Sequence, residues 1–262
     1  MRLAWLTDVH LNFVGFSDRQ KFYERVLDTR PDAVMVGGDI SEGPGLAPQT
    51  HEMHQALGVP LYFVLGNHDF YRSSFEDVHE RMSEFSQPSR VWLTHAGAQL
   101  LTADTALIGD DGWADGRLGD YFNSNVMLND YLLIREFIGL SPPARFRLLN
   151  QLGDEAAARI TIKLQQACAQ RKRVILLTHV PPFLEACWHE GRHSDPNWLP
   201  HFASKSFGDA IVSVMDEHPD CHVTVLCGHT HSSGVVQMRP NVLVKTGAAV
   251  YRQPAVQEVF DV

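Results

Sequence analysis

Polar side chains that can bind metals or transfer protons follow short apolar runs at five places in the sequence. The runs span 3–6, 33–36, 61–65, 174–177 and 223–227, and the side chains that follow them are Asp8, His10, Asp39, Asn67, His68, His179, His229 and His231. This mixture of imidazole, carboxylate and amide oxygen favours manganese, iron or zinc over calcium. It offers more ligands than one tetrahedral zinc accepts, and it suits two metal ions that share a bridging carboxylate.

The apolar runs themselves predict the elements that position these side chains. Runs that are apolar at every position, without alternation, are typical of strands covered on both faces. Segments 106–108 and 242–244 predict two further strands. Helical stretches lie between the runs, so the chain predicts an α/β fold with mainly parallel strands. Because ligands sit beyond the carboxyl ends of strands in such folds, we expect the polar side chains to converge there.

Several capping patterns predict where the helices begin. These are Ser17 with Gln20, Ser73 with Glu76, Ser141 with Pro142, and Ser206 with Asp209. The third pattern opens a stretch that reaches about Gln170 and is expected to be interrupted near Gly153. Segments 110–125 and 185–202 fit neither helix nor strand and follow predicted strands, so we expect them to be loops that shape a pocket. No linker divides the chain, and we expect one domain over residues 1–262.

The composition limits the classes of partner. The 262 residues carry a formal net charge of −9, which argues against broad attraction to nucleic acid or to anionic lipid. The four cysteines form no C-x-x-C pair, no signal-peptide pattern is present, and no apolar stretch approaches the roughly 18 residues of a membrane span. We therefore expect a cytoplasmic protein with free thiols and no membrane partner. The oligomeric state is open.

The ordered motifs resemble those of the calcineurin-like metallophosphoesterase superfamily. The motifs are Asp-x-His at Asp8, Gly-Asp at Asp39, Gly-Asn-His-Asp from Gly66, a single His at His179, and Gly-His-x-His at the end. Any one of them is weak evidence, but five in order, each after an apolar run, form a specific pattern. The resemblance implies a four-layer α/β/β/α sandwich, in which helices flank two mixed sheets.

The resemblance also implies a role for each residue. One metal would be held by Asp8, His10, Asp39 and His231, and the other by Asp39, Asn67, His179 and His229. His68 would face the substrate and donate a hydrogen bond to Asp69, which would fix its tautomer and favour its protonated form. His68 and Asp69 are thus the expected catalytic pair. The expected substrate contacts are Asn67, His68 and Arg72.

The expected reaction is hydrolysis of a small phosphomonoester or phosphodiester. A hydroxide bridging two manganese, iron or zinc ions would attack phosphorus, and His68 would protonate or stabilise the departing oxygen. Two alternatives stay open: a nuclease of the same superfamily, and a scaffold that keeps the fold without the chemistry. The acidic charge and the lack of a Lys/Arg cluster disfavour the nuclease, and the complete set of motifs disfavours the scaffold.

Overall fold

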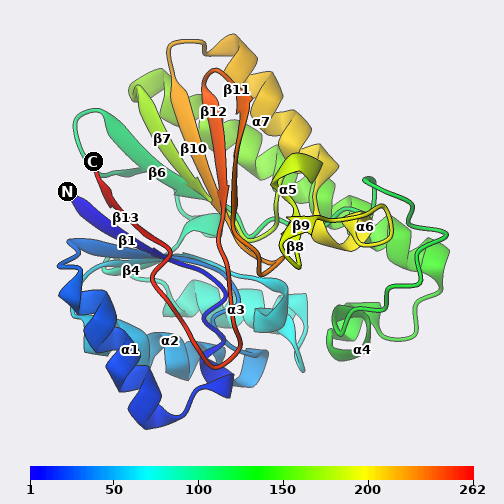
Figure 1. Cartoon of the computed structure of the whole chain (residues 1–262), viewed down its shortest axis with the longest axis horizontal. Coiled ribbons are helices and arrows are strands. Elements are labelled where there is room, and N and C mark those ends of the chain that lie inside the picture. The colour runs from blue at the N-terminus through cyan, green and yellow to red at the C-terminus, as the bar shows by residue number, and fades with distance from the viewer.

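The computed structural model describes residues 1–262, and its centre is a pair of β-sheets packed face to face (Figure 1). The first sheet has the order β13-β1-β2-β3-β4, and all its strands are parallel except β13, which pairs antiparallel with β1. Its strands are β1 (Arg2–Leu6), β2 (Ala33–Gly37), β3 (Leu61–Val64), β4 (Arg90–Trp92) and β13 (Glu258–Asp261).

The second sheet has the order β11-β12-β10-β7-β6-β5, with four parallel strands in the middle and an antiparallel strand at each edge. Its strands are β5 (Gln99–Leu100), β6 (Thr105–Gly109), β7 (Arg173–Leu177), β10 (His222–Cys227), β11 (Gly234–Arg239) and β12 (Val242–Thr246). The apolar runs of the sequence thus correspond to β1, β2, β3, β7 and β10. The two further strands expected at 106–108 and 242–244 are β6 and β12.

Three separate apolar clusters define four layers. One cluster contains Trp5, Met35 and Leu226, from both sheets, and fills the space between them. A second packs the outer face of the first sheet against α1 (Phe16–Asp28), α2 (Gly43–Leu57) and α3 (Phe75–Phe85). The third packs the outer face of the second sheet against α5 (Pro142–Gln170) and α7 (Lys205–Glu217). The expected α/β/β/α sandwich of two mixed sheets is therefore confirmed (Figure 1).

The helix boundaries differ from the capping patterns in instructive ways. Helix α1 begins at Phe16, one residue before the expected Ser17, and α3 is capped by Ser74, whose hydroxyl accepts from the amide of Asp77, instead of by Ser73. Helix α5 follows Ser141 as expected. It runs unbroken through Gly153, so the expected interruption is wrong. A Cβ at Gly153 would lie 2.5 Å from the Cβ of Asp115, so the glycine is needed for close packing instead of for a break.

The remaining segments join these layers at one rim. They contain the short helices α4 (Asp130–Leu133) and α6 (Leu199–Phe202), a small hairpin of β8 (Trp188–His189) and β9 (Arg192–His193), and 3-10 turns at Leu11–Phe13, Asn67–Phe70, Leu93–His95, Arg135–Phe137 and Leu184–Ala186. In Figure 1, α4, α6 and the hairpin lie on one side of the molecule, with the hairpin nearest to the carboxyl ends of β7 and β10. Among them α4, α6, β8 and the turn 67–70 contribute residues to the candidate site and its pocket.

Candidate metal centre

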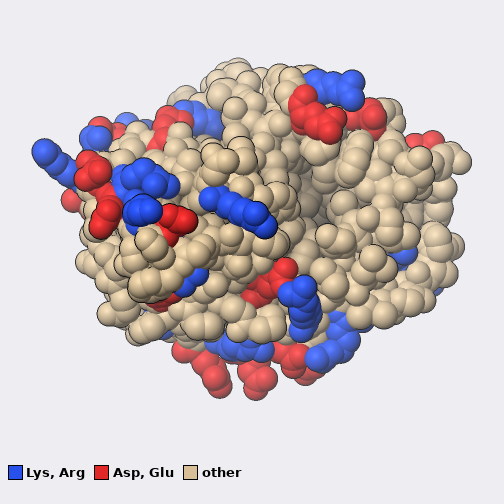
Figure 2. Space-filling model, turned by 60° about the horizontal axis from the view of Figure 1, so that its bottom comes forward, with Lys and Arg blue, Asp and Glu red and all other residues tan.

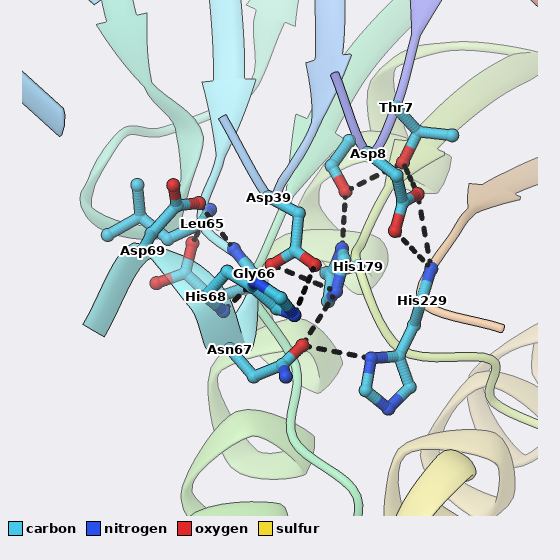
Figure 3. Close-up of polar contacts among 12 residues, drawn as sticks. Thr7, Asp8, Asp39, Leu65, Gly66, Asn67, His68, Asp69, His179 and His229 are labelled. Carbon is cyan, nitrogen blue, oxygen red and sulfur yellow. Dashed lines mark hydrogen bonds and ion pairs between the residues drawn. The ribbon is translucent and has the colours of Figure 1, made fainter. Parts of the chain in front are cut away.

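The polar side chains that follow five different strands meet where the two sheets come together (Figure 3). Strands β1, β2 and β3 of the first sheet supply Asp8, His10, Asp39, Asn67 and His68, and strands β7 and β10 of the second supply His179, His229 and His231. Asp8, His10, Asp39 and His179 are at most 3% exposed. Buried ionisable groups are costly unless they pair with one another or bind a metal, so this convergence requires an electrostatic explanation.

The backbone adopts unusual conformations to bring these side chains together. Five of the nine non-glycine residues with positive φ are Asp8, His10, Asp39, His229 and His231. Two glycines allow the close approach: a Cβ at Gly228 would lie 2.0 Å from Oδ2 of Asp8, and one at Gly66 would lie 2.2 Å from Oδ1 of Asp39. Conformations that cost energy persist where the surrounding structure enforces them, and they cluster at functional sites.

We define half-site 1 as Asp8, His10, Asp39 and His231, whose potential ligand atoms all lie within 4.8 Å of one another. Nε2 of His10 is 3.2 Å from Nε2 of His231 and 3.7 Å from Oδ2 of Asp39. Nε2 of His231 is 3.4 Å from Oδ1 of Asp8. Two imidazoles and two carboxylates therefore point into one small volume, as the ligands of a transition metal do.

We define half-site 2 as Asn67, His179 and His229, together with the shared Asp39. Nδ1 of His179 faces the carbonyl oxygen of Gly37 at 2.8 Å, and Nε2 of His229 faces the carbonyl oxygen of His201 at 3.1 Å. Each ring nitrogen must donate to its carbonyl, so the other nitrogen of a neutral ring carries a lone pair. Those lone pairs point at Oδ1 of Asn67, at 3.1 Å for His179 and 2.9 Å for His229 (Figure 3).

The orientation of Asn67 is fixed by an acid that the sequence analysis missed. Asp130, at the start of α4, accepts from Nδ2 of Asn67 at 2.8 Å and from the hydroxyl of Tyr71 at 2.7 Å. The amide nitrogen therefore points to Asp130, and the amide oxygen must point to the histidines. Three acceptor atoms then face one another without a proton between them, an arrangement that a cation would stabilise. The residues present fit a metal ion at this position.

Burial favours the metal-binding form of two candidate ligands, His10 and His229. It lowers the pKa of His10 to about 3 and that of His229 to about 3. A neutral imidazole is the metal-binding form. For Asp8, burial opposes ionisation, but the hydrogen bond with His231 and the neighbouring histidines lower its pKa below the ordinary value. For Asp39, burial and the charge of Asp8 raise the pKa, so the pair disfavours two adjacent negative charges in the absence of a cation.

The expected contact between His68 and Asp69 is absent. The carboxylate of Asp69 accepts from the backbone amides of Ser41 and Gly66, both at 2.8 Å, and Nδ1 of His68 has no hydrogen-bond partner (Figure 3). Asp69 closes the 3-10 turn 67–70, so its side chain is turned back toward the backbone. His68 instead stacks on Tyr71, with ring centroids 4.3 Å apart. Burial and the neighbouring His10 lower the pKa of His68 to about 2, which opposes the expected protonated form.

A pocket of about 270 Å³ opens onto this centre. His189 and Phe202 border it, and the 185–202 segment to which they belong contains the β8–β9 hairpin and α6, although neither helix nor strand was expected there. On the other side the wall comes from 128–130, and the 110–125 segment supplies no lining residue. In that segment Trp113 is buried against Phe137. Arg72 pairs with Glu42 and does not line this pocket.

The geometry agrees with the family to which the chain belongs. Residues 1–233 match the model of the calcineurin-like phosphoesterase family, so the chain is a member of that family. Over 123 residues it is 29% identical to a zebrafish protein described as a transmembrane protein with metallophosphoesterase domain. That alignment covers 39% of this chain and 28% of the relative. No helix of the structure is long and apolar enough to cross a bilayer.

Two solved structures share the fold. The phosphopantetheinyl hydrolase of Mycobacterium tuberculosis is 16% identical, with a TM-score of 0.66 over 95% of this chain and 89% of that one. A dimetal phosphatase from zebrafish is 14% identical, with a TM-score of 0.59 over 97% of this chain and 89% of that one. At these identities the similarity establishes the architecture of the chain, and its chemistry must be argued from its own residues.

Proposed function

We propose that the chain hydrolyses a small phosphomonoester or phosphodiester with two metal ions, each manganese, iron or zinc, held in half-sites 1 and 2. The observation that carries this proposal is the convergence of Asn67 Oδ1 with the lone pairs of His179 and His229, beside a carboxylate shared with half-site 1. Oδ1 of Asp39 is 3.5 Å from Nε2 of His179, and Oδ2 is 3.7 Å from Nε2 of His10. Asp39 thus faces both half-sites and is the proposed bridging ligand.

When bound, the metal ions would lower the pKa of a water molecule toward neutrality and neutralise charge on the phosphoryl oxygens. The side chains divide the remaining work. Asp8, His10 and His231 would complete half-site 1, and Asn67, His179 and His229 would complete half-site 2. Because the two ionised carboxylates Asp8 and Asp39 offset only part of the charge of two divalent ions, the centre would attract an anionic phosphoryl group in spite of the acidic protein around it.

His68 is the residue we propose to act on the departing oxygen. It lines the pocket, and its Nε2 lies 3.9 Å from Oδ2 of Asp39. With its lowered pKa, His68 is neutral at pH 7 and can donate a hydrogen bond from one ring nitrogen. An arriving phosphoryl anion would raise this pKa and allow proton donation to the leaving group. Asp69 supports this role indirectly, because it holds the turn that carries His68.

The test is a panel of phosphomonoesters, phosphodiesters and cyclic nucleotides, assayed after manganese, iron or zinc is restored in turn to metal-depleted protein. We expect turnover with at least one metal and one substrate class. A protein that binds no metal and cleaves nothing in the panel would favour the scaffold instead. Cleavage of DNA or RNA with a steep dependence on salt would favour the nuclease, although the net charge of −9 argues against it.

A further inference from the structure

A second, larger pocket adjoins the metal centre on its outer side. It has a volume of about 570 Å³ and shares His68, Tyr71 and Tyr251 with the pocket that opens onto the centre. Figure 2 shows this face of the molecule hollowed, with basic and acidic side chains beside the hollow. A phosphoryl group bound to the metals would occupy the inner pocket. The outer pocket is therefore available to the part of the substrate that leaves.

One wall of the outer pocket is aromatic. The rings of Phe13 and Tyr251 meet edge to face with centroids 5.3 Å apart, and the two residues stay 40% and 45% exposed. The ring of Tyr251 also lies 4.7 Å from that of His10 and 5.1 Å from that of His231. It therefore spans from half-site 1 to the outer pocket. Two half-exposed rings at a pocket mouth offer a surface on which a planar group can stack.

Two arginines, Arg72 and Arg252, also line the outer pocket and give it positively charged groups. Arg72 is engaged with Glu42, whereas the guanidinium of Arg252 makes no hydrogen bond or ion pair. On its other side Arg252 borders a hollow lined by Asp18, Lys21 and Arg25. Lys21 pairs with Asp18 there, so Arg25 and Arg252 remain as cationic groups on a chain whose net charge is −9. Both pocket arginines have positive φ, 59° and 68°. Such backbone conformations recur where ligands are clamped, and a free guanidinium is suited to a carboxylate or phosphate.

We infer that the outer pocket binds a leaving group that combines a planar ring with a second anionic group, the ring on Phe13 and Tyr251 and the anion on Arg252. This inference rests on the proposed function, because it assigns the leaving-group side of the same reaction. It predicts a substrate with two anionic groups separated by an aromatic or heteroaromatic body. A bare phosphate ester of a small aliphatic alcohol would leave both walls unused.

The test compares aryl phosphates that differ in one charge. With the metal-restored protein, we expect kcat/KM for 4-carboxyphenyl phosphate, or for its longer 4-(2-carboxyethyl)phenyl homologue, to exceed that for the matching methyl ester by at least about tenfold, the value of one charge-assisted hydrogen bond. Arg252→Ala should bring this ratio close to one. Arg30→Ala is the matched control, because Arg30 is exposed and also has positive φ, 54°, but lies in the turn before β2. It should leave the ratio unchanged.

The aromatic wall is tested separately. Tyr251→Leu and Phe13→Leu should each reduce the preference for phenyl phosphate over glycerol 2-phosphate by several-fold, and leave the carboxylate preference in place. Equal turnover of acids and methyl esters by the unaltered protein, or a ratio that survives Arg252→Ala, would overturn the inference while leaving the proposed function intact.

Absence of turnover with every ester would instead count against the proposed function. Calorimetry with 4-carboxybenzylphosphonate and benzylphosphonate, which cannot be hydrolysed, then decides about the pocket. The inference is supported if 4-carboxybenzylphosphonate binds more tightly than benzylphosphonate and if Arg252→Ala removes this difference. Equal binding of both compounds to the unaltered protein rejects it.

Discussion

The two half-sites are held in place by different means. In half-site 2, His179 and His229 each donate to a backbone carbonyl, and Asp130 fixes the amide of Asn67. In half-site 1, Nδ1 of His10 has no hydrogen-bond partner, and the ring is positioned by packing against Phe13, His68, His231 and Tyr251. The imidazoles and the amide of half-site 2 are thus oriented by hydrogen bonds and His10 of half-site 1 mainly by ring packing, whereas the carboxylate of Asp8 accepts from the hydroxyl of Thr7 and the amide of His229.

The difference matters because outer hydrogen bonds orient a ligand and increase its basicity, and their loss costs about 10- to 100-fold in metal affinity. The two histidines and the asparagine of half-site 2 have three such bonds, and Nδ1 of His10 has none, so half-site 2 should bind its ion more tightly. Half-site 1 contains two carboxylates, so its metal affinity should depend more on the attraction between opposite charges. The following predictions either separate the two half-sites or show that they behave as one.

The largest effect is expected for Asp39→Asn, because Asp39 faces both half-sites. Metal affinity should fall in both by at least about 100-fold, the upper end of the cost of losing an outer partner, and turnover should fall with it. Calorimetry and elemental analysis measure the two occupancies. If one half-site stayed full while the other emptied, Asp39 would not bridge them.

His68→Ala should separate catalysis from metal binding. We expect both ions to be retained and turnover to slow by roughly 10²- to 10⁴-fold, the usual range for a lost proton donor. His222→Ala is the control, because His222 is exposed at the opposite end of β10, and it should change neither quantity. Unaltered turnover in the His68 variant would remove this residue from the reaction.

Asp130→Ala should weaken half-site 2 alone. Without Asp130, the amide of Asn67 keeps only its weaker bond to the hydroxyl of Tyr71, and we expect the affinity of half-site 2 to drop by about 10- to 100-fold. The metal affinity of half-site 1 should stay unchanged. The exposed Asp209→Ala on α7 controls for the loss of one negative charge. Equal weakening of both half-sites would mean that Asp130 acts through the long-range effect of its negative charge instead of by orienting Asn67.

The smallest effect is expected in the order of metal removal. Stepwise chelation should empty half-site 1 before half-site 2, with affinities that differ by about tenfold or more. Anomalous diffraction from partly depleted crystals would locate the remaining ion. An ion left beside His10 and His231, and none beside His179 and His229, would reverse the comparison.

Much of this architecture is predictable from the sequence because it follows local rules. Runs such as 174–177 are apolar at each position, and the strands they form are covered on both faces. Each ligand candidate follows such a run directly, so the end of the strand determines its place. The motif order then predicted the two-sheet arrangement by resemblance, which the apolar runs alone do not specify.

What escaped prediction depends on contacts between distant segments. Asp130 and Tyr251 follow no strand and belong to no motif, and only the tertiary fold brings them next to Asn67 and His10. The partner of His229 is a backbone carbonyl, that of His201, which no side-chain pattern reveals. The orientation of Asp69 was predicted wrongly because adjacency along the chain does not decide which way a side chain leaves a tight turn.

The left-handed backbone at the candidate ligands has a consequence for engineering this protein. At φ 42° and 59°, His10 and His231 carry a backbone cost of up to about 1 kcal/mol that a glycine would avoid, and the packing of their rings opposes that gain. A campaign that selects for heat resistance alone therefore acts on these positions through backbone strain and packing, without regard to metal binding. Thermostable variants should be sought with the left-handed positions held constant and with metal occupancy scored alongside melting temperature.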